Sequence, residues 1–263
     1  MKINSKIKLG LINFTNCLPL NYTLEKWQLE NIELVYGTPA QLNQLMHEGK
    51  IHAAPVSSIE YLKNKNKYKL IETACISSDG ECRSVILFSQ KEMKQIKKIA
   101  LPNDSASSIA MLKIIMKDHD ITYNEHNYNN ISPDNDAVLF IGDNALIRNN
   151  TGESCFSYDL GKLWKDLNGY PAVFGTWVKQ KDDFEELDNL IPQAIETGLG
   201  LYFNEVLEFA SVNLKLPKEI IEDYLTSKIK YNFTERHKKS LEKFEELYNN
   251  NFSNHNNICN LRL

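Results

Sequence analysis

Four segments place small hydroxyl or amide side chains where an apolar run gives way to a helical pattern. They run from Asn13 to Pro19, Pro55 to Glu60, Asn103 to Ser108 and Gly142 to Ala145. Backbone N–H groups in the first turn of a helix attract a carboxylate or a phosphate, and hydroxyl side chains add further donors. The four segments together therefore indicate a site for a small anion. Alternatively, each segment only caps its helix, since Ser, Asp and Asn are preferred N-cap residues.

The elements that must position these segments alternate along the chain. Apolar runs predict strands at residues 6–12, 32–36, 53–56, 84–89, 98–101, 137–141 and 172–178. Helical patterns lie between them at about residues 20–28, 38–48, 57–63, 105–117 and 160–167, and the chain from residue 181 onward is nearly all helical. Such alternation predicts an α/β fold with mainly parallel sheets, in which ligands bind beyond the carboxyl ends of the strands.

Composition narrows the class of ligand. The length of 263 residues is enough for two domains or one large one, and 42% hydrophobic with 24% charged residues is typical of globular proteins. The net charge is −4, so no general cationic field would hold the protein on nucleic acid or on an anionic membrane. We therefore expect a small-molecule ligand, with no nucleic acid and no membrane as partner.

The five cysteines are scattered and have no spacing that is typical of a metal site; they are Cys17, Cys75, Cys82, Cys155 and Cys259. Polar residues interrupt the N-terminal apolar stretch, so we expect no signal peptide, and no apolar run is long enough for a transmembrane helix. Neither a glycine-rich phosphate loop nor a nicotinamide fingerprint occurs. The sequence thus predicts a cytoplasmic protein with reduced thiols and neither a metal nor an organic cofactor.

Short motifs follow one another in a characteristic order from about residue 8 to residue 180. They are Gly10, Asn16–Leu20, Gly37–Pro39, Ala54–Tyr61, Ser78–Gly80, Arg83–Val85, Ser105–Ser108, Ile141–Leu146 and Tyr158–Gly161, followed by Trp164, Gly169, Pro171, Phe174 and Trp177. This series resembles the chorismate dehydratase family of the futalosine route to menaquinone. The helical C-terminal third contributes no motif to the resemblance.

The resemblance implies an α/β, two-lobed fold like that of the periplasmic binding proteins (type II), with a ligand cleft between the lobes. Lobe one would comprise residues 1–89 plus 176–263, including the C-terminal helices, and lobe two residues 90–175. Residues 84–89 would form one crossover strand and residues 172–178 the return strand.

The implied reaction removes water from chorismate and gives 3-[(1-carboxyvinyl)oxy]benzoate, so the enzyme would be a carbon–oxygen lyase. By the same resemblance Asn16 and Ser84 would be catalytic. The residues expected to bind the substrate are Ser57, Ser58, Arg83, Ser105, Ser107, Ser108 and Asp143. Asn16, Ser57 and Ser84 would lie on one wall of the cleft, and Ser105–Ser108 on the other. Alternatively, Asn16 only forms a turn, and the serines cap helices or fill a strand.

The proton acceptor is left open by the sequence. Glu60, Asp79, Asp143 and Asp159 are candidates by residue type, although Glu60 lies within a predicted helix and Asp143 can cap one. None of the six histidines lies in a matching motif. The alternative is that the substrate's own enolpyruvyl carboxylate, held close to the ring hydrogen, takes the proton.

Two other functions are compatible with the implied fold. A 1,4-dihydroxy-6-naphthoate synthase of the same pathway is expected to carry a catalytic histidine, and a solute-binding protein for a small anion is expected to carry a signal peptide.

In the C-terminal region, Leu241, Phe244, Leu247 and Tyr248 have helical spacing. They predict an apolar stripe that packs on lobe one or forms the face of a homodimer.

Overall fold

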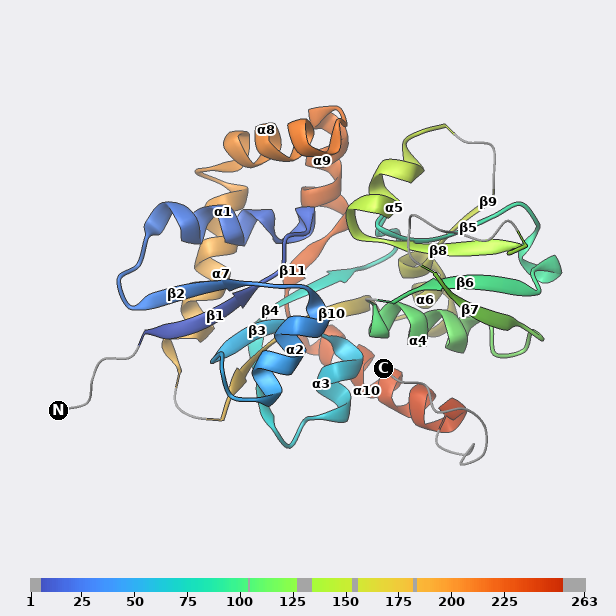
Figure 1. Cartoon of the computed structure of the whole chain (residues 1–263), viewed down its shortest axis with the longest axis horizontal. Helices are drawn as coiled ribbons and strands as arrows, with labels where there is room; N and C mark the ends of the chain where they lie inside the picture. Colours follow the sequence, from blue (N-terminus) through green and yellow to red (C-terminus); the bar gives the residue numbers. More distant parts are fainter. Residues whose placement is uncertain (1–5, 104, 127–133, 153–155, 182–183, 253–263) are drawn as a thin grey trace. The chain divides into compact units, whose positions relative to one another are not determined.

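The apolar runs of the sequence form the central strands of two separate sheets (Figure 1). The computed structural model describes residues 6–103, 105–126, 134–152, 156–181 and 184–252. The chain divides into two compact units. The first unit contains the residues up to Ser77 together with Val173–Thr234, and the second contains Ser78–Ala172 together with the residues from Glu235 on.

The first unit is built on a six-stranded sheet in the order β11-β4-β10-β3-β1-β2. Its strands are β1 (Ile7–Leu11), β2 (Ile32–Tyr36), β3 (Ala53–Ser57), β4 (Tyr68–Ser78), β10 (Ala172–Gln180) and β11 (Lys230–Asn232). β1 is parallel to β2 and β3, and Leu9 lies opposite both Leu34 and Ala53. β10 is antiparallel to β3, with Gly175 opposite Ser57. The carboxyl ends of β1, β2 and β3 therefore lie at one edge of this sheet.

The helices of the first unit are α1 (Leu18–Trp27), α2 (Pro39–His47), α3 (Ser58–Lys63), α7 (Glu186–Leu199), α8 (Phe203–Leu214) and α9 (Lys218–Asp223), and a π-helix at Tyr224–Lys228 follows α9 directly. Thr38 begins α2 with a capping box shared with Gln41. α1 packs closely on α7, because a Cβ atom at Gly198 would lie only 2.0 Å from the Pro19 carbonyl oxygen. Only glycine allows this approach.

The second unit is built on a five-stranded sheet in the order β7-β6-β8-β5-β9. Its strands are β5 (Val85–Ser89), β6 (Lys98–Pro102), β7 (Thr122–His126), β8 (Ala137–Ile141) and β9 (Phe156–Asp159), and its helices are α4 (Ala106–Ile115), α5 (Gly142–Asn149), α6 (Leu160–Asn168) and α10 (Glu235–Phe252). β6 is parallel to β8, whereas β5 is antiparallel to β8, with Val85 opposite Ile141. The ends of β6 and β8 and the beginning of β5 therefore share one edge.

This division differs in two places from the lobes expected from the sequence. Residues 84–89 do not act as a crossover strand, because β5 hydrogen-bonds to β8 and β9 within the second sheet. The stripe on α10 contributes to the second unit rather than to lobe one: the ring of Phe244 lies 5.1 Å from that of the fully buried Trp164 on α6. Both differences arise from contacts between residues distant in sequence, which local patterns do not reveal.

None of the helices in the described part of the chain is both long enough and apolar enough to span a membrane.

Candidate active site

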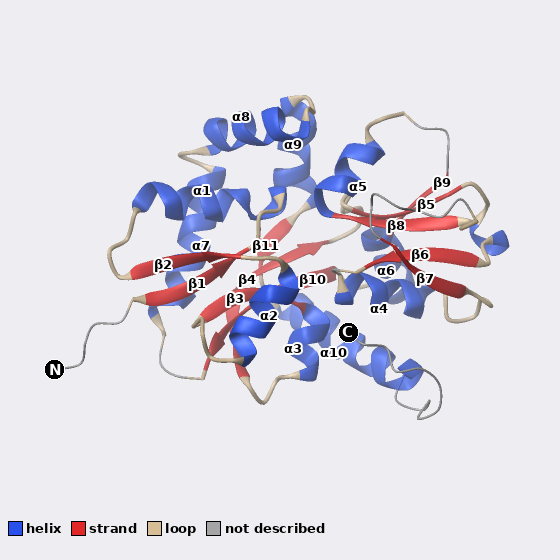
Figure 2. Ribbon diagram, in the orientation of Figure 1, coloured by secondary structure: helices blue, strands red, loops and turns tan. Residues whose placement is uncertain are grey.

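In the first unit the parallel neighbours β1 and β3 end at the same edge of the sheet (Figure 2). Asn16 follows β1, and Ser57 ends β3. Asn16 lies in a 3-10 turn, Thr15–Cys17, between β1 and α1. Ser57 is the last residue of β3 and the N-cap of α3. Asn21 of α1 fixes the end of β1, because its side-chain amide donates to the Ile12 carbonyl oxygen at 3.0 Å. The predicted strand-to-helix turns therefore exist, and β1 and β3 place them side by side.

Asn16 is half-buried, and its carboxamide is held by two neighbours. Its Nδ2 donates to the hydroxyl oxygen of Tyr224 at 3.3 Å, and the thiol of Cys17 donates to its Oδ1 at 3.3 Å. A carboxamide has two N–H donors and an oxygen with two lone pairs. These two contacts leave a second N–H group and a second lone pair for a ligand.

The two serines of the β3–α3 turn differ in what their hydroxyls do. The Ser57 oxygen accepts from the Glu60 N–H at 3.3 Å as a helix cap, while its own O–H remains a donor. Ser58 is fully buried and donates to the Val173 carbonyl oxygen at 2.6 Å. The Ser58 hydroxyl therefore joins α3 to β10, and its proton already has a backbone acceptor; the substrate-binding role expected for it stays a prediction.

The second unit gathers the other predicted residues at one edge of its own sheet. Ser105 is the N-cap of α4, which follows β6, and Gly142 begins α5, which follows β8. The Gly142 N–H donates to the Ser84 carbonyl oxygen at 2.7 Å, which ties the start of α5 to the residue before β5. Gly142 has a φ of 56°, a left-handed conformation that glycine adopts without strain. Ser84 and the first turns of α4 and α5 therefore meet at this edge.

The starts of α4 and α5 present backbone donors. The N-cap residue is Ser105 in α4 and Ile141 in α5, and in the described structure neither side chain forms a capping hydrogen bond with its helix. First-turn N–H groups lack partners inside the helix, and the helix dipole adds positive potential there. Asp143 contributes a carboxylate to the first turn of α5 and would repel an anion. The start of α4, which contains the buried Ser107 and Ser108 and no acidic residue in its first turn, is therefore the more favourable of the two for an anion.

Asp159 holds the segment that carries Arg83 and Ser84. Its carboxylate accepts hydrogen bonds from the backbone N–H groups of Cys82 at 3.1 Å and Arg83 at 2.7 Å. It also caps α6 through the Lys162 N–H at 3.1 Å. Arg83 has a φ of 60°, which is strained for a residue with a side chain. The hydrogen bond from the Arg83 N–H to the Asp159 carboxylate thus helps to stabilise this conformation.

Replacement of Asp159 by Asn is expected to disturb this segment. The new NH2 group would face N–H donors, so we expect the free energy of unfolding to fall by about 1–3 kcal/mol. If Arg83 and Ser84 position the substrate, kcat is expected to fall about tenfold to a hundredfold. Thermal melts and initial rates measure the two effects. The control is Asp166→Asn on the same helix, an exposed residue that pairs with Lys162; equal melting temperatures for the two variants would contradict the role of Asp159.

Three of the four carboxylates considered as proton acceptors are engaged elsewhere. Glu60 Oε1 lies 2.7 Å from His47 Nε2. Asp79 pairs with Lys165 and Arg236, each at 3.0 Å. Burial works to raise the pKa of Asp79, but the hydrogen bonds from these two cations outweigh it and hold the pKa below its ordinary value of 3.8. Asp79 is therefore a weak base, and the Asp159 carboxylate is occupied by backbone donors.

Among the residues that the structure describes, no group of three or more His, Cys, Asp or Glu side chains is placed to hold a metal ion.

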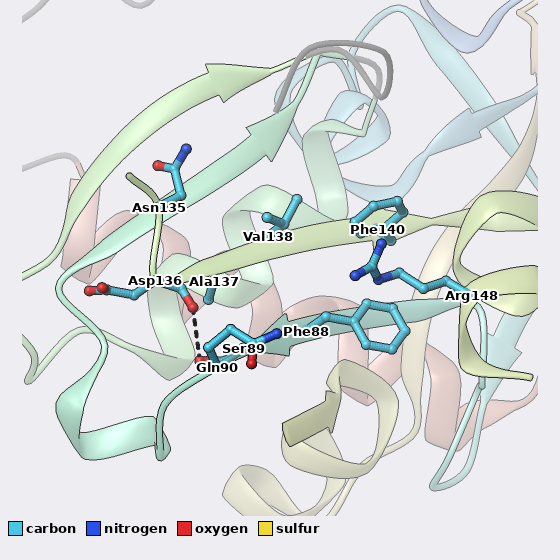
Figure 3. A pocket seen from close by; sticks show the side chains of 9 residues that line it. All are labelled: Phe88, Ser89, Gln90, Asn135, Asp136, Ala137, Val138, Phe140 and Arg148. Carbon is cyan, nitrogen blue, oxygen red and sulfur yellow. Dashed lines mark hydrogen bonds between the residues drawn. The ribbon is translucent and has the colours of Figure 1, made fainter. Parts of the chain in front are cut away.

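A cavity of about 250 Å³ lies on the second unit away from the predicted residues (Figure 3). Phe88 and Phe140 form its apolar floor, and the guanidinium of Arg148 lies over their rings at 5.3 and 4.9 Å. Asp136 at its rim pairs with Lys91. None of the residues predicted to act in catalysis or substrate binding lines this cavity.

Comparison with known proteins finds relatives along almost the whole chain. The model of a family described as menaquinone biosynthesis matches residues 7–250. A chorismate dehydratase from Thermus thermophilus is 27% identical over 260 residues, covering 90% of this chain and 93% of the relative. A chorismate dehydratase from Campylobacter jejuni is 26% identical over 222 residues, covering 82% of this chain and 79% of the relative.

Solved structures agree with the predicted fold class. Protein AF1704 from Archaeoglobus fulgidus superposes with a TM-score of 0.76 at 18% identity, covering 94% of this chain and 97% of that one. The periplasmic aliphatic sulphonate binding protein SsuA from Escherichia coli superposes with a TM-score of 0.66 at 12% identity, covering 94% and 92%. The α/β fold of the periplasmic-binding-protein type is thereby confirmed.

Proposed function

Because the chain belongs to the menaquinone biosynthesis family, we propose that it is a chorismate dehydratase, a hydro-lyase that converts chorismate into 3-[(1-carboxyvinyl)oxy]benzoate. The observation that carries this proposal is the similarity to two chorismate dehydratases, one of which aligns with 90% of this chain. The family match from residue 7 to residue 250 supports it over both units.

The reaction sets clear requirements. The ring hydrogen beside the ether oxygen leaves as a proton, the neighbouring hydroxyl leaves with its bonding electrons, and the two together make one water. The ring becomes aromatic, which drives the reaction. The enzyme must bind two carboxylates, assist the departure of a poor leaving group and keep the enolpyruvyl ether intact. Positioned hydrogen-bond donors meet these needs.

The proposed residues of the first unit are Asn16 and Ser57. The second N–H of the Asn16 carboxamide donates to the enolpyruvyl end or to the departing hydroxyl. The Ser57 O–H donates to a carboxylate. Ser58 is a weaker candidate, because its hydroxyl is buried against a backbone carbonyl.

The proposed residues of the second unit bind the rest of the substrate. Ser84 donates a hydrogen bond to the substrate, and Arg83 contributes positive charge. A carboxylate binds at the first turn of α4, which contains Ser107 and Ser108 after the N-cap Ser105. Asp143 accepts from a substrate hydroxyl, because its charge disfavours a carboxylate.

Conversion of chorismate is the direct test. The purified protein, treated with a chelator and given no nucleotide, is expected to convert chorismate into a product lighter by one water, measured by mass spectrometry. Heat-treated protein is the control for spontaneous loss. Binding without turnover would favour a solute-binding protein. Activity that chelation abolishes and an added metal restores would contradict cofactor-free catalysis.

We also propose that the enzyme acts in the cytoplasm, since the thiols of Cys75 and Cys82 are buried and lie outside any disulfide. A homodimer remains a prediction, which sedimentation of the purified protein decides.

A further inference from the structure

The carboxamide of Asn16 depends on a tyrosine from the far end of the first unit. Tyr224 is 208 residues away in sequence, yet its hydroxyl oxygen accepts from Asn16 Nδ2 at 3.3 Å. The Cys17 thiol contacts the other end of the same amide. A planar carboxamide held at both ends cannot exchange its N–H2 and C=O sides without breaking both bonds. The contact with Tyr224 therefore determines which way the second N–H points.

The backbone holds Tyr224 rigidly. The side chain is 1% exposed, and Tyr224 is the first residue of the π-helix that ends at Lys228. The Ile229 N–H closes this wide turn by donating to the Tyr224 carbonyl oxygen at 3.0 Å. β11 begins immediately afterwards and pairs with β4, with Lys230 opposite Ser77. π-helical turns are rare and occur often at functional sites. The turn fixes the tyrosine between a helix and a paired strand.

A second phenol lies beside the first but outside this chain of hydrogen bonds. Tyr231 on β11 is 8% exposed, and its hydroxyl is buried without a hydrogen bond to any described residue. Burial raises the pKa of Tyr231 well above its ordinary value of 10.0, and the nearby Tyr224 and Cys17 raise it further. Both phenols are thus buried, and Tyr224 alone of the two is seen in contact with Asn16. A buried hydroxyl without a partner needs an explanation, and here it lies near Tyr224 and Cys17, the two residues that contact the Asn16 carboxamide.

We propose that Tyr224 is a positioning residue for the dehydration: its hydroxyl fixes the Asn16 carboxamide so that the second N–H is directed at the bound substrate. This inference rests on the proposed function of Asn16. Tyr224 acts through Asn16 and does not touch the reacting atoms. The C-terminal part of the first unit, which carries no recognisable motif, thereby contributes to catalysis.

The kinetic test uses Tyr224→Phe, which removes the acceptor oxygen and keeps the ring. We expect kcat for chorismate to fall about tenfold, the size of one lost hydrogen bond, while KM stays within about twofold. In the Asn16→Ala background the same change is expected to have no further effect on kcat, because the amide that it positions is absent. Equal losses in both backgrounds would overturn the proposal.

Tyr231→Phe is the matched control. It removes a buried hydroxyl from the same neighbourhood, but one without a hydrogen bond to a described residue, so kcat is expected to stay within about twofold and the melting temperature to stay equal or rise. If Tyr231→Phe lost as much kcat as Tyr224→Phe, then removing either buried hydroxyl would impair catalysis equally. That result would overturn the specific role of Tyr224.

A second readout does not depend on activity. The side-chain amide signals of Asn16 are identified in the NMR spectrum of ¹⁵N-labelled protein by their disappearance in Asn16→Ala. In Tyr224→Phe they are expected to shift and to exchange with water faster, whereas in Tyr231→Phe they stay in place. Unchanged signals in Tyr224→Phe would overturn the positioning role. Should the wild-type protein fail to convert chorismate, the proposed function falls, and this spectrum still decides whether Tyr224 fixes the amide.

Discussion

The Asn16→Ala variant is expected to lose about 10²- to 10³-fold in kcat on chorismate while it keeps its fold, the size observed when one donor to a developing charge is removed. The change deletes the N–H group that we assign to the substrate. It also ends the contact with Tyr224, for which we expect a cost in the free energy of unfolding of about 1 kcal/mol. Initial rates and thermal melts on the same preparation separate the two effects.

The matched control is Asn31→Ala, an exposed asparagine of the same unit that precedes β2 and lies outside the four segments of the predicted anion site. Its kcat is expected to stay within about twofold of the wild type, because surface substitutions away from special contacts change little. If Asn16→Ala kept its kcat and lost only stability, Asn16 would be a turn residue and the catalytic assignment would be wrong.

Substrate amidated at the enolpyruvyl carboxylate is expected to bind but to lose about 10²- to 10⁴-fold in turnover, the range that a general base contributes. The reason is the environment of the protein carboxylates. Glu60 is hydrogen-bonded to His47, and Asp79 has a lowered pKa between two cations. In this scheme the substrate's own carboxylate, which is held beside the ring hydrogen by covalent attachment, acts as the base. Single-turnover rates at saturation are the measurement, because amidation also removes a charge that helps binding.

The complementary set of variants is Glu60→Gln, Asp79→Asn and Asp143→Asn. Each is expected to retain turnover within about tenfold of the wild type, since none removes the proton acceptor in this scheme. Asp159→Asn is excluded from this comparison, because it disturbs the segment that carries Ser84. One of the three variants that stays folded and loses more than about a thousandfold in kcat would identify a base on the protein and would contradict substrate assistance.

Most of the strands that local patterns predict are buried ones; the exception is the edge strand β2, whose run Ile32–Tyr36 is apolar enough to be predicted. β1, β3, β5, β6 and β8 are apolar runs in the interior of their sheets, and their signal is strong. β7 and β9 are edge strands with mostly exposed or half-exposed residues, and β11 has three residues, so their sequences lack such a run. β4 alternates irregularly between buried and exposed positions. The turns that follow the buried strands were therefore predictable, as was the place of Asn16.

The parts of the candidate site that the sequence did not reveal depend on long-range contacts. Asp159 is acidic and lies in a motif, which suggests a base; only its contacts with Cys82 and Arg83, about 77 residues away, identify it as a structural acceptor. Tyr224 lies in a helical pattern that predicts core packing. Its hydrogen bond to Asn16 leaves no local signal. Ser58 has the same residue type and location as Ser57, and only tertiary packing distinguishes their roles.

The return of the chain to the second unit at Glu235 has a consequence for synthesis on the ribosome. Trp164 of α6 is covered by Phe244 and donates to Ser240 at 3.4 Å, and both partners lie on α10. Phe244 is made 80 residues after Trp164. At a translation rate of about 5–20 residues per second, Phe244 is therefore synthesised roughly 4–16 s after the Trp164 that it covers. The nascent second unit must carry an open apolar surface while the whole of Val173–Thr234 is being translated, so the docking of α10 is its last folding step.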